Sequence, residues 1–174
     1  LQIVKDSDTR PWFFLQTAHT TYGMWVMETG HLEHLYYGER ITVDSQDPSS
    51  CAPLVIQRAF APGNTCTYDR EHPQISMEDV CLEVGTLGKG DIREPFLEVR
   101  FTDGSVTSDF TFDSYEVITL KEREQYLQDS GLPHSYSEAE TDSAECLQII
   151  LQDITNNLEL QLFYTVFEEC DVIT

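Results

Sequence analysis

Three features of the sequence predict an all-β fold, in which two packed, mostly antiparallel sheets form a sandwich with long irregular loops. Hydrophobic and polar residues alternate with a period of two along much of the chain, as in half-buried strands. These stretches are rich in Val, Trp, Tyr, Phe and Thr, which suit a pleated surface. Prolines and glycines crowd the segment Pro48–Pro95, which indicates loops. We expect roughly seven to nine strands in a single domain, residues 1–174.

The N-terminal part of the chain contains three strand candidates. Trp12–Thr17 and Thr21–Glu28 come first, Thr29-Gly30 marks a turn, and His31–Tyr37 completes the set. The aromatic and β-branched content of each stretch favours a strand over a helix.

The middle of the chain divides into an irregular part and a predicted hairpin. Loops as long as those in Pro48–Pro95 are usually functional or cover a partner. Phe96–Phe101 and Val106–Phe112 alternate, and Asp103-Gly104 between them is a strong turn signal. We therefore predict a β-hairpin over 96–112.

The C-terminal part combines strands with one short helical segment. Tyr115–Leu120 and Cys146–Leu151 are strand candidates, whereas Lys121–Asp129 predicts one or two helical turns. Ser135–Ala144 is polar and acidic, which indicates an exposed loop. Leu158–Thr174 looks like strand to its last residue, and the chain does not begin with Met. We therefore expect a piece of a longer protein.

Composition limits the classes of partner. The net charge is −21, from 31 acidic and 10 basic residues, so neither nucleic acid nor an anionic membrane is expected as a partner. No apolar run approaches the length of a membrane span. The five cysteines are odd in number and widely spaced, which argues against a disulfide framework or a zinc site. We expect reduced thiols, a cytoplasmic protein, and neither metal nor cofactor.

No catalytic residue is assigned within this chain. Nucleophile elbows, phosphate-binding loops and metal-binding H-E-x-x-H motifs are absent from the sequence. His31 and His34 lie three residues apart on a predicted strand, on opposite faces, so a shared metal is not expected. Five aromatic residues could stack on sugar rings, but their strand positions favour the core: Trp12, Tyr22, Trp25, Tyr36 and Tyr37.

One loop carries polar residues between glycines: Gly88-Lys89-Gly90-Asp91-Ile92-Arg93-Glu94-Pro95. The glycines allow the backbone to approach another surface closely. Asp91 and Arg93 could pair locally and hold the loop. Alternatively, they could be offered to a ligand or to a neighbouring subunit.

These loop residues also carry a resemblance to a known family. Gly90–Pro95 (GDIREP) resembles the G-D-F-R-E-P segment in the N-terminal domain of bacterial family 36 α-galactosidases. Further blocks resemble the family's motifs in the same order: Phe14–Thr17, Gly30–Gly38, Arg58–Pro62, Gly131–Pro133, Glu138–Thr141 and Tyr164–Thr174. Each block is weak alone, but the ordered set covers essentially the whole chain.

The resemblance implies a β-supersandwich, of which residues 1–174 form an N-terminal and partial piece. The family's catalytic (β/α)8 barrel, which holds both catalytic aspartates, would follow beyond this chain, so the chain alone should be inactive. The implied reaction is hydrolysis of terminal α-galactosides such as melibiose, raffinose and stachyose, with retention. The implied partners are the barrel and neighbouring subunits of a homotetramer.

The family's loops reach towards a neighbour's active site, which suggests where this chain meets substrate or a neighbouring subunit. The candidate residues are Gln57, Arg58, Gly90, Asp91 and Arg93. Family members often carry Asp where Gln57 stands, and an amide hydrogen-bonds without bringing a charge. The aromatic residues usual in the segment 75–87 are also missing here.

Three other readings remain open at this stage. The chain could be a stand-alone carbohydrate-binding sandwich, or a module that serves only assembly. The whole protein could also act on α-N-acetylgalactosaminides, because the residues that read the sugar's 2-position would lie in the barrel.

Overall fold

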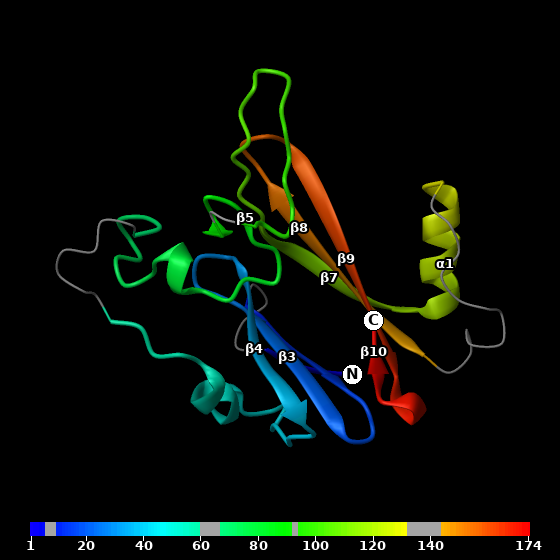
Figure 1. Ribbon diagram of the computed structural model, residues 1–174. Helices are drawn as coiled ribbons and strands as arrows, with labels where there is room; N and C mark the ends of the chain where they lie inside the picture. Colours follow the sequence, from blue (N-terminus) through cyan, green and yellow to red (C-terminus); the bar gives the residue numbers. More distant parts are fainter. Residues whose placement is uncertain (6–9, 60–66, 92–93, 132–143) are drawn as a thin grey trace.

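The structure, a computed structural model, describes residues 1–5, 10–59, 67–91, 94–131 and 144–174. Within these ranges, two four-stranded antiparallel sheets dominate (Figure 1). The first sheet has the order β1-β2-β3-β4: β1 (Gln2–Lys5), β2 (Pro11–Gln16), β3 (Thr20–Val26) and β4 (Leu32–Glu39). The second has the order β10-β9-β8-β7: β7 (Thr111–Thr119), β8 (Glu145–Asp153), β9 (Leu158–Phe167) and β10 (Val172–Ile173). The predicted all-β sandwich is confirmed.

The remaining elements are short. The stretch of sequence between β4 and β7 contains one parallel pair, β5 (Thr86–Leu87) and β6 (Gly90–Asp91). It also contains two 3-10 helices, η1 (Pro48–Leu54) and η2 (Met77–Asp79). A helix and a last 3-10 turn complete the set: α1 (Leu120–Asp129) and η4 (Glu168–Cys170). No helix in the described part of the chain is long and apolar enough to cross a membrane.

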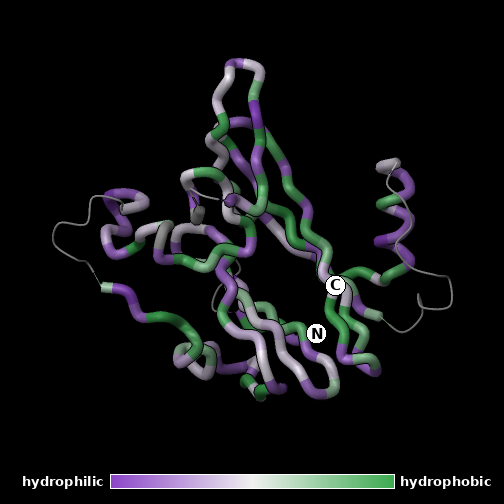
Figure 2. Tube along the Cα trace, viewed as in Figure 1, coloured by the Kyte–Doolittle hydropathy of each residue, from purple (hydrophilic) through white to green (hydrophobic). Residues whose placement is uncertain are grey.

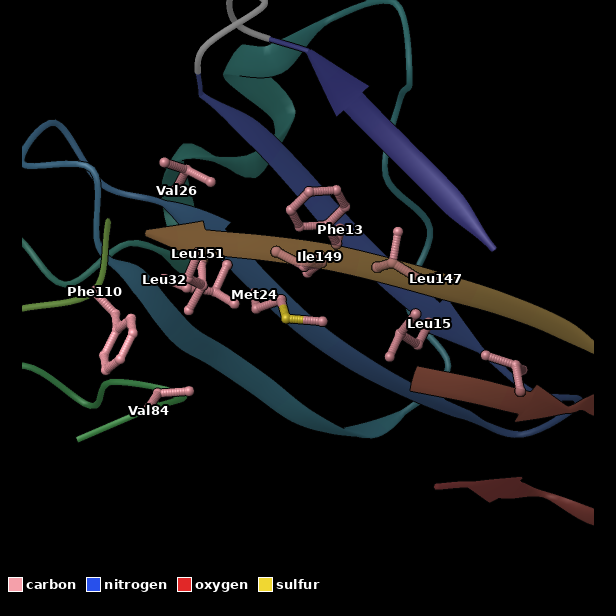
Figure 3. Close-up of a cluster of buried hydrophobic side chains, with 11 residues drawn as sticks. Phe13, Leu15, Met24, Val26, Leu32, Val84, Phe110, Leu147, Ile149 and Leu151 are labelled. Atoms are coloured by element: carbon pink, nitrogen blue, oxygen red, sulfur yellow. The ribbon is translucent and has the colours of Figure 1, made fainter. Parts of the chain in front are cut away.

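The main core lies between the two sheets. Phe13 and Leu15 of β2 and Met24 of β3 share one cluster with Leu147 and Ile149 of β8, and all five are fully buried. Figure 3 shows these side chains in the layer between the strands. Alternate residues of β2 and β8 point into this layer, because successive side chains of a strand face opposite sides. At about 1.5–3 kcal/mol for each large apolar side chain, this layer is the main stabilising feature of the fold.

The first sheet is buried on its outer face as well. Trp12 and Phe14 of β2 point away from the main core and pack with Val43 and Cys51. A third cluster joins Met27 at the end of β3 to the irregular segment: Ile75, Met77 and Val80, with Trp25 at its edge. The irregular segment therefore forms a layer over the outer face of the first sheet. In Figure 2, hydrophobic residues lie at intervals along these loops, between hydrophilic stretches.

Most of the predicted strands are confirmed. Their ends shift by one or two residues, except that the strand predicted over Tyr115–Leu120 begins four residues earlier, at Thr111. Thr29-Gly30 makes the predicted turn, with Gly30 at φ +84°. The helical segment Lys121–Asp129 is longer than predicted, at 10 residues, and it begins with a capping box between Thr119 and Glu122. The short strands β1, β5 and β6 were not predicted.

The hairpin prediction over 96–112 is wrong in part. Its turn forms, because Phe101 N–H donates to the Ser105 carbonyl at 2.9 Å and Gly104 takes φ +88°. The arms Phe96–Phe101 and Val106–Phe112 do not pair as strands, and the next strand starts only at Thr111. The tip of this loop projects away from both sheets (Figure 1), and Phe96 is 73% exposed, whereas Leu97 and Phe110 at its base pack on the main core.

Four further predictions concern the C-terminal strand, the aromatic residues, an acidic loop and the cysteines. The strand-like run Leu158–Thr174 is interrupted by η4, and Asp171 takes a left-handed conformation there. Of the aromatic residues assigned to the core, Tyr37 is instead 69% exposed. The predicted loop Ser135–Ala144 lies outside the described residues, apart from its last position. Cys51, Cys81, Cys146 and Cys170, the cysteines within the described ranges, are all free thiols.

Candidate functional site

The candidate residues Gln57 and Arg58 follow η1 and lie beside the outer face of the first sheet. Gln57 is exposed, whereas the side chain of Arg58 is only 11% exposed. The Arg58 guanidinium forms an ion pair with Glu33 of β4, which is 1% exposed. Trp25 Nε1 donates to the same carboxylate at 2.8 Å. Arg58 therefore faces inward and fixes the backbone that presents Gln57 to solvent.

A small pocket of about 160 Å³ opens at this point. Its rim includes Gln57, Ile56 and Gln74, and its wall includes Trp25 and Glu28. Gln74 Nε2 donates to Glu28 at 2.7 Å, which joins two sides of the rim. Amides, a carboxylate and an indole side chain are groups that bind hydroxyl-rich ligands.

The candidate residues Gly90 and Asp91 form the short strand β6. Leu87 of β5 pairs with Asp91, and Gly88 between the two strands takes φ +80°, a conformation that favours glycine. Thr86 and Lys89 exchange two backbone hydrogen bonds of 2.9 Å, which close the turn. Arg93 lies outside the described residues, so the Asp91–Arg93 ion pair stays a prediction.

The two candidate segments meet at the same 3-10 turn. Arg58 Nη2 donates to the carbonyl of Asp79, the last residue of η2, at 3.1 Å. Strand β6 packs against η2 from its own side. Gln57-Arg58 and Gly90-Asp91, far apart in sequence, thus flank one element. We name the set of Gln57, Arg58, η2 and β6 the η2 site.

His31 and His34, which the sequence placed on opposite faces, bind different carboxylates. His31 Nε2 lies 2.8 Å from Asp109 Oδ1, and His34 Nδ1 lies 3.3 Å from Glu83 Oε1. Burial acts to raise the pKa of Asp109, but the hydrogen bond from His31 and the positive charges of His31 and Lys89 outweigh it and hold the pKa at about 2. No group of three or more metal-binding side chains gathers among the described residues.

Sequence reasoning missed a second polar cluster, which lies between the two sheets. Glu83, with a side chain 5% exposed, accepts hydrogen bonds from Tyr22 of β3 at 2.7 Å and from Tyr164 of β9 at 2.8 Å. Burial and the nearby Glu83 charge raise the pKa of both phenols. A pocket of about 310 Å³ opens beside them, with Tyr37 and Thr174 on its wall. The cluster joins residues that are too distant in sequence for any local pattern to reveal it.

Comparison with known proteins agrees with this architecture. The chain is 38% identical over 164 residues to the bifunctional α-galactosidase/sucrose kinase AgaSK of Mediterraneibacter gnavus, covering 93% of this chain and 16% of that protein. The crystal structure of the α-galactosidase from Lactobacillus brevis superposes with a TM-score of 0.76 at 30% identity, over 98% of this chain and 21% of that chain. An AgaA variant from Geobacillus stearothermophilus in complex with raffinose gives 0.73 at 26% identity, over 93% and 21%.

This chain thus spans only about one fifth of the proteins it resembles. Residues 30–174 match the model of the glycosyl hydrolase family 36 N-terminal domain, and that range includes β4, the η2 site and the second sheet. The chain therefore belongs to the glycosyl hydrolase family 36 N-terminal domain family.

Proposed function

We propose that this chain is the N-terminal β-sandwich portion of an α-galactosidase that hydrolyses terminal α-galactosides such as melibiose, raffinose and stachyose, with retention. The relatives that support this proposal are α-galactosidases, and AgaA structures carry raffinose or stachyose. The observation that carries the proposal is the family match over residues 30–174.

The proposed role of this portion is support and assembly. It packs on a catalytic (β/α)8 barrel of the same chain, contacts neighbouring subunits of a cytoplasmic homotetramer, and borders the substrate pocket through the η2 site and Arg93. The meeting of Gln57-Arg58 and Gly90-Asp91 at one turn supports this role, because both segments can then reach the same neighbour. The net charge of −21 supports the expectation that nucleic acid and membranes are not partners.

We propose that the catalytic residues lie outside this portion. A retaining glycosidase needs two carboxyl groups about 5 Å apart across the sugar. Of the described residues that line the pocket beside Gln57, Glu28 is the single carboxylate. The neighbouring Glu33 is buried and ion-paired with Arg58, so it cannot serve as a nucleophile there.

A chromogenic α-galactoside tests the proposal. The complete protein that contains this chain should hydrolyse it, and residues 1–174 alone should show no turnover above the blank. A chromogenic α-N-acetylgalactosaminide run in parallel distinguishes the related activity. Turnover by the pure 174-residue chain, or none by the complete protein with either substrate, would overturn the proposal.

A second candidate function is a stand-alone carbohydrate-binding module. The amides of Gln57 and Gln74 beside the Trp25 indole favour it, because this combination suits sugar hydroxyls. Calorimetry of the 174-residue chain with galactose and raffinose separates the two candidates. Millimolar or tighter binding favours the module, and no heat of binding favours the enzyme portion.

A further inference from the structure

One carboxylate outside the η2 site, that of Asp109, contacts side chains from three separate segments. Asp109 lies just before β7, with its side chain 28% exposed. Its carboxylate accepts the hydroxyl of Tyr68 at 3.1 Å, contacts Lys89 Nζ at 3.3 Å and lies 2.8 Å from His31 Nε2. An ionised carboxylate only accepts, so His31 carries its proton on Nε2 in this contact.

The three partners of Asp109 come from different segments. His31 stands at the start of β4, Tyr68 lies in the irregular segment before η2, and Lys89 immediately precedes β6. They also contact one another: the Lys89 ammonium lies 4.7 Å from the centre of the Tyr68 ring, and that ring meets His31 edge-on at 4.8 Å. Asp109 therefore bridges the first sheet to both flanks of η2.

Asp109 is itself held by the second sheet. Its backbone N–H donates to Asp153 Oδ2 at 3.1 Å, and Asp153, at the end of β8, is 1% exposed. The adjacent Ser108 carbonyl accepts the hydroxyl of Thr86 at 2.7 Å, which fastens β5 to the same point. The carboxylate is thus anchored to the sandwich core, and its contact with Lys89, together with the Thr86 hydrogen bond, attaches the turn between β5 and β6 to that core.

We propose that Asp109 is a positioning residue for the η2 site: by holding Lys89 and Tyr68, it sets where Gly90-Asp91 stands against η2, and so how well the complete enzyme captures substrate. The part concerning substrate rests on the proposed function. The part concerning anchoring does not. Asp109 touches no reacting atom, so its loss should change capture and leave the chemical step intact.

The first test is steady-state kinetics of the complete enzyme with Asp109→Asn. The amide keeps the shape of the side chain but removes the charge that holds Lys89. We expect the KM for a chromogenic α-galactoside to rise by about tenfold while kcat stays within about twofold, because a displaced loop weakens binding of the ground state and transition state alike. Lys89→Met should reproduce the effect, and the double variant should be no worse than either single variant.

Asp113→Asn is the matched control, because Asp113 is exposed on β7 and its carboxylate accepts a hydrogen bond from the hydroxyl of its neighbour Ser114. It should leave both KM and kcat unchanged. An unchanged KM in Asp109→Asn would overturn the proposal. So would a loss of kcat that is equal in Asp109→Asn and in the control Asp113→Asn, or a rise in KM for the Asp109/Lys89 double variant that equals the product of the two single effects.

Hydrogen exchange in the same complete protein separates the two parts of the inference. The N–H groups of Thr86 and Lys89 each donate a hydrogen bond to the carbonyl of the other residue, so their exchange rates report directly on the turn before β6. Asp109→Asn should speed their exchange by about tenfold, whereas Asp113→Asn should not. Unchanged exchange overturns the anchoring. Faster exchange in a protein that hydrolyses no galactoside supports the anchoring and overturns the proposed function instead.

Discussion

Glu33 is a buried acid on β4, in a run of residues whose sequence pattern does not indicate which face of the strand is buried. It is 1% exposed, and its charge is compatible with burial because Arg58 and the Trp25 indole N–H both donate to it. Arg58 depends on Glu33 in the same way, since its side chain is 11% exposed. The pair attaches the segment after η1 to β4, which places Gln57 at the rim of its pocket.

Removing Glu33 should therefore be strongly destabilising. In Glu33→Ala, the largely buried Arg58 guanidinium loses its charged partner and keeps only carbonyl acceptors such as that of Asp79, and the Trp25 N–H loses its acceptor. We expect the free energy of unfolding to fall by about 3–5 kcal/mol, measured by urea denaturation. Glu98→Ala, whose partner Arg100 lies on the exposed projecting loop, serves as the control and should change stability by less than about 0.5 kcal/mol. A loss below about 1 kcal/mol in the Glu33 variant would contradict a structural role for the pair.

Asp109 should make stability depend on pH in the acid range. Its pKa in the folded protein is about 2, below the ordinary value of 3.8, so the folded state favours the ionised form. The resulting stabilisation is complete above the unfolded pKa and is lost as pH falls through about 2. Asp109→Asn should cost about 2 kcal/mol at pH 6, and the difference from wild type should stay nearly constant down to about pH 4 and then shrink to roughly half by pH 3. Urea denaturation across that range measures it, and a constant or growing difference would refute this assignment.

At the scale of elements, the sequence predicted those strands whose pattern matches their burial. The alternation in β3, β8 and β9 corresponds to faces that pack on the core, so a local pattern was sufficient there, whereas β2 is apolar on both faces because both are covered. The alternation over Phe96–Phe101 did not produce a strand, because only Leu97 of that run packs on the main core and Phe96 is exposed. The candidates Gln57, Arg58, Gly90 and Asp91 came from the family resemblance and stay predictions, whereas the turn η2 beside them was not named by the sequence. That the two candidate segments meet at η2, and that Glu33 and Asp109 attach them to the sheets, depends on contacts between distant segments. No local sequence pattern encodes such contacts.

Helix α1 is fixed at its start by a capping box and along its length by packing. The Thr119 hydroxyl accepts the N–H of Glu122, and the Glu122 carboxylate accepts the N–H of Thr119. Leu120 and Leu127 are buried, and the Tyr126 ring lies 5.5 Å from that of Phe163. Thr119→Ala should lower the free energy of unfolding by about 1 kcal/mol, seen as a lower urea midpoint. Thr102→Ala, on the exposed projecting loop, should leave the midpoint unchanged; equal effects would show that the cap is not the cause.

At the scale of the whole molecule, polar clusters join the two sheets and the irregular segment. Apolar packing is not directional, so by itself it does not fix how these layers are aligned. Glu83 links Tyr22 of the first sheet to Tyr164 of the second. Asp109 links the start of β4 to β6, and its N–H bonds Asp153 of β8. Hydrogen bonds have directions, so these links fix the positions of the layers as well as holding them together. Tyr68 and Lys89 of the irregular segment are thereby attached, through Asp109, to Asp153 of the second sheet.

Gln57 offers the sharpest test of the surface of the irregular segment in the complete enzyme. The residue is exposed at the rim of its pocket, so shortening its side chain should leave the fold intact. If its amide reaches substrate or a neighbouring subunit, Gln57→Ala should raise the KM for an α-galactoside by about five- to tenfold with an unchanged urea midpoint, as expected for one hydrogen bond of about 1–1.5 kcal/mol. Gln46→Ala, exposed on the loop before η1, is the matched control and should change neither quantity. Identical kinetics for wild type and Gln57→Ala would remove Gln57 from the substrate side, and a lowered midpoint would show that its amide serves the fold.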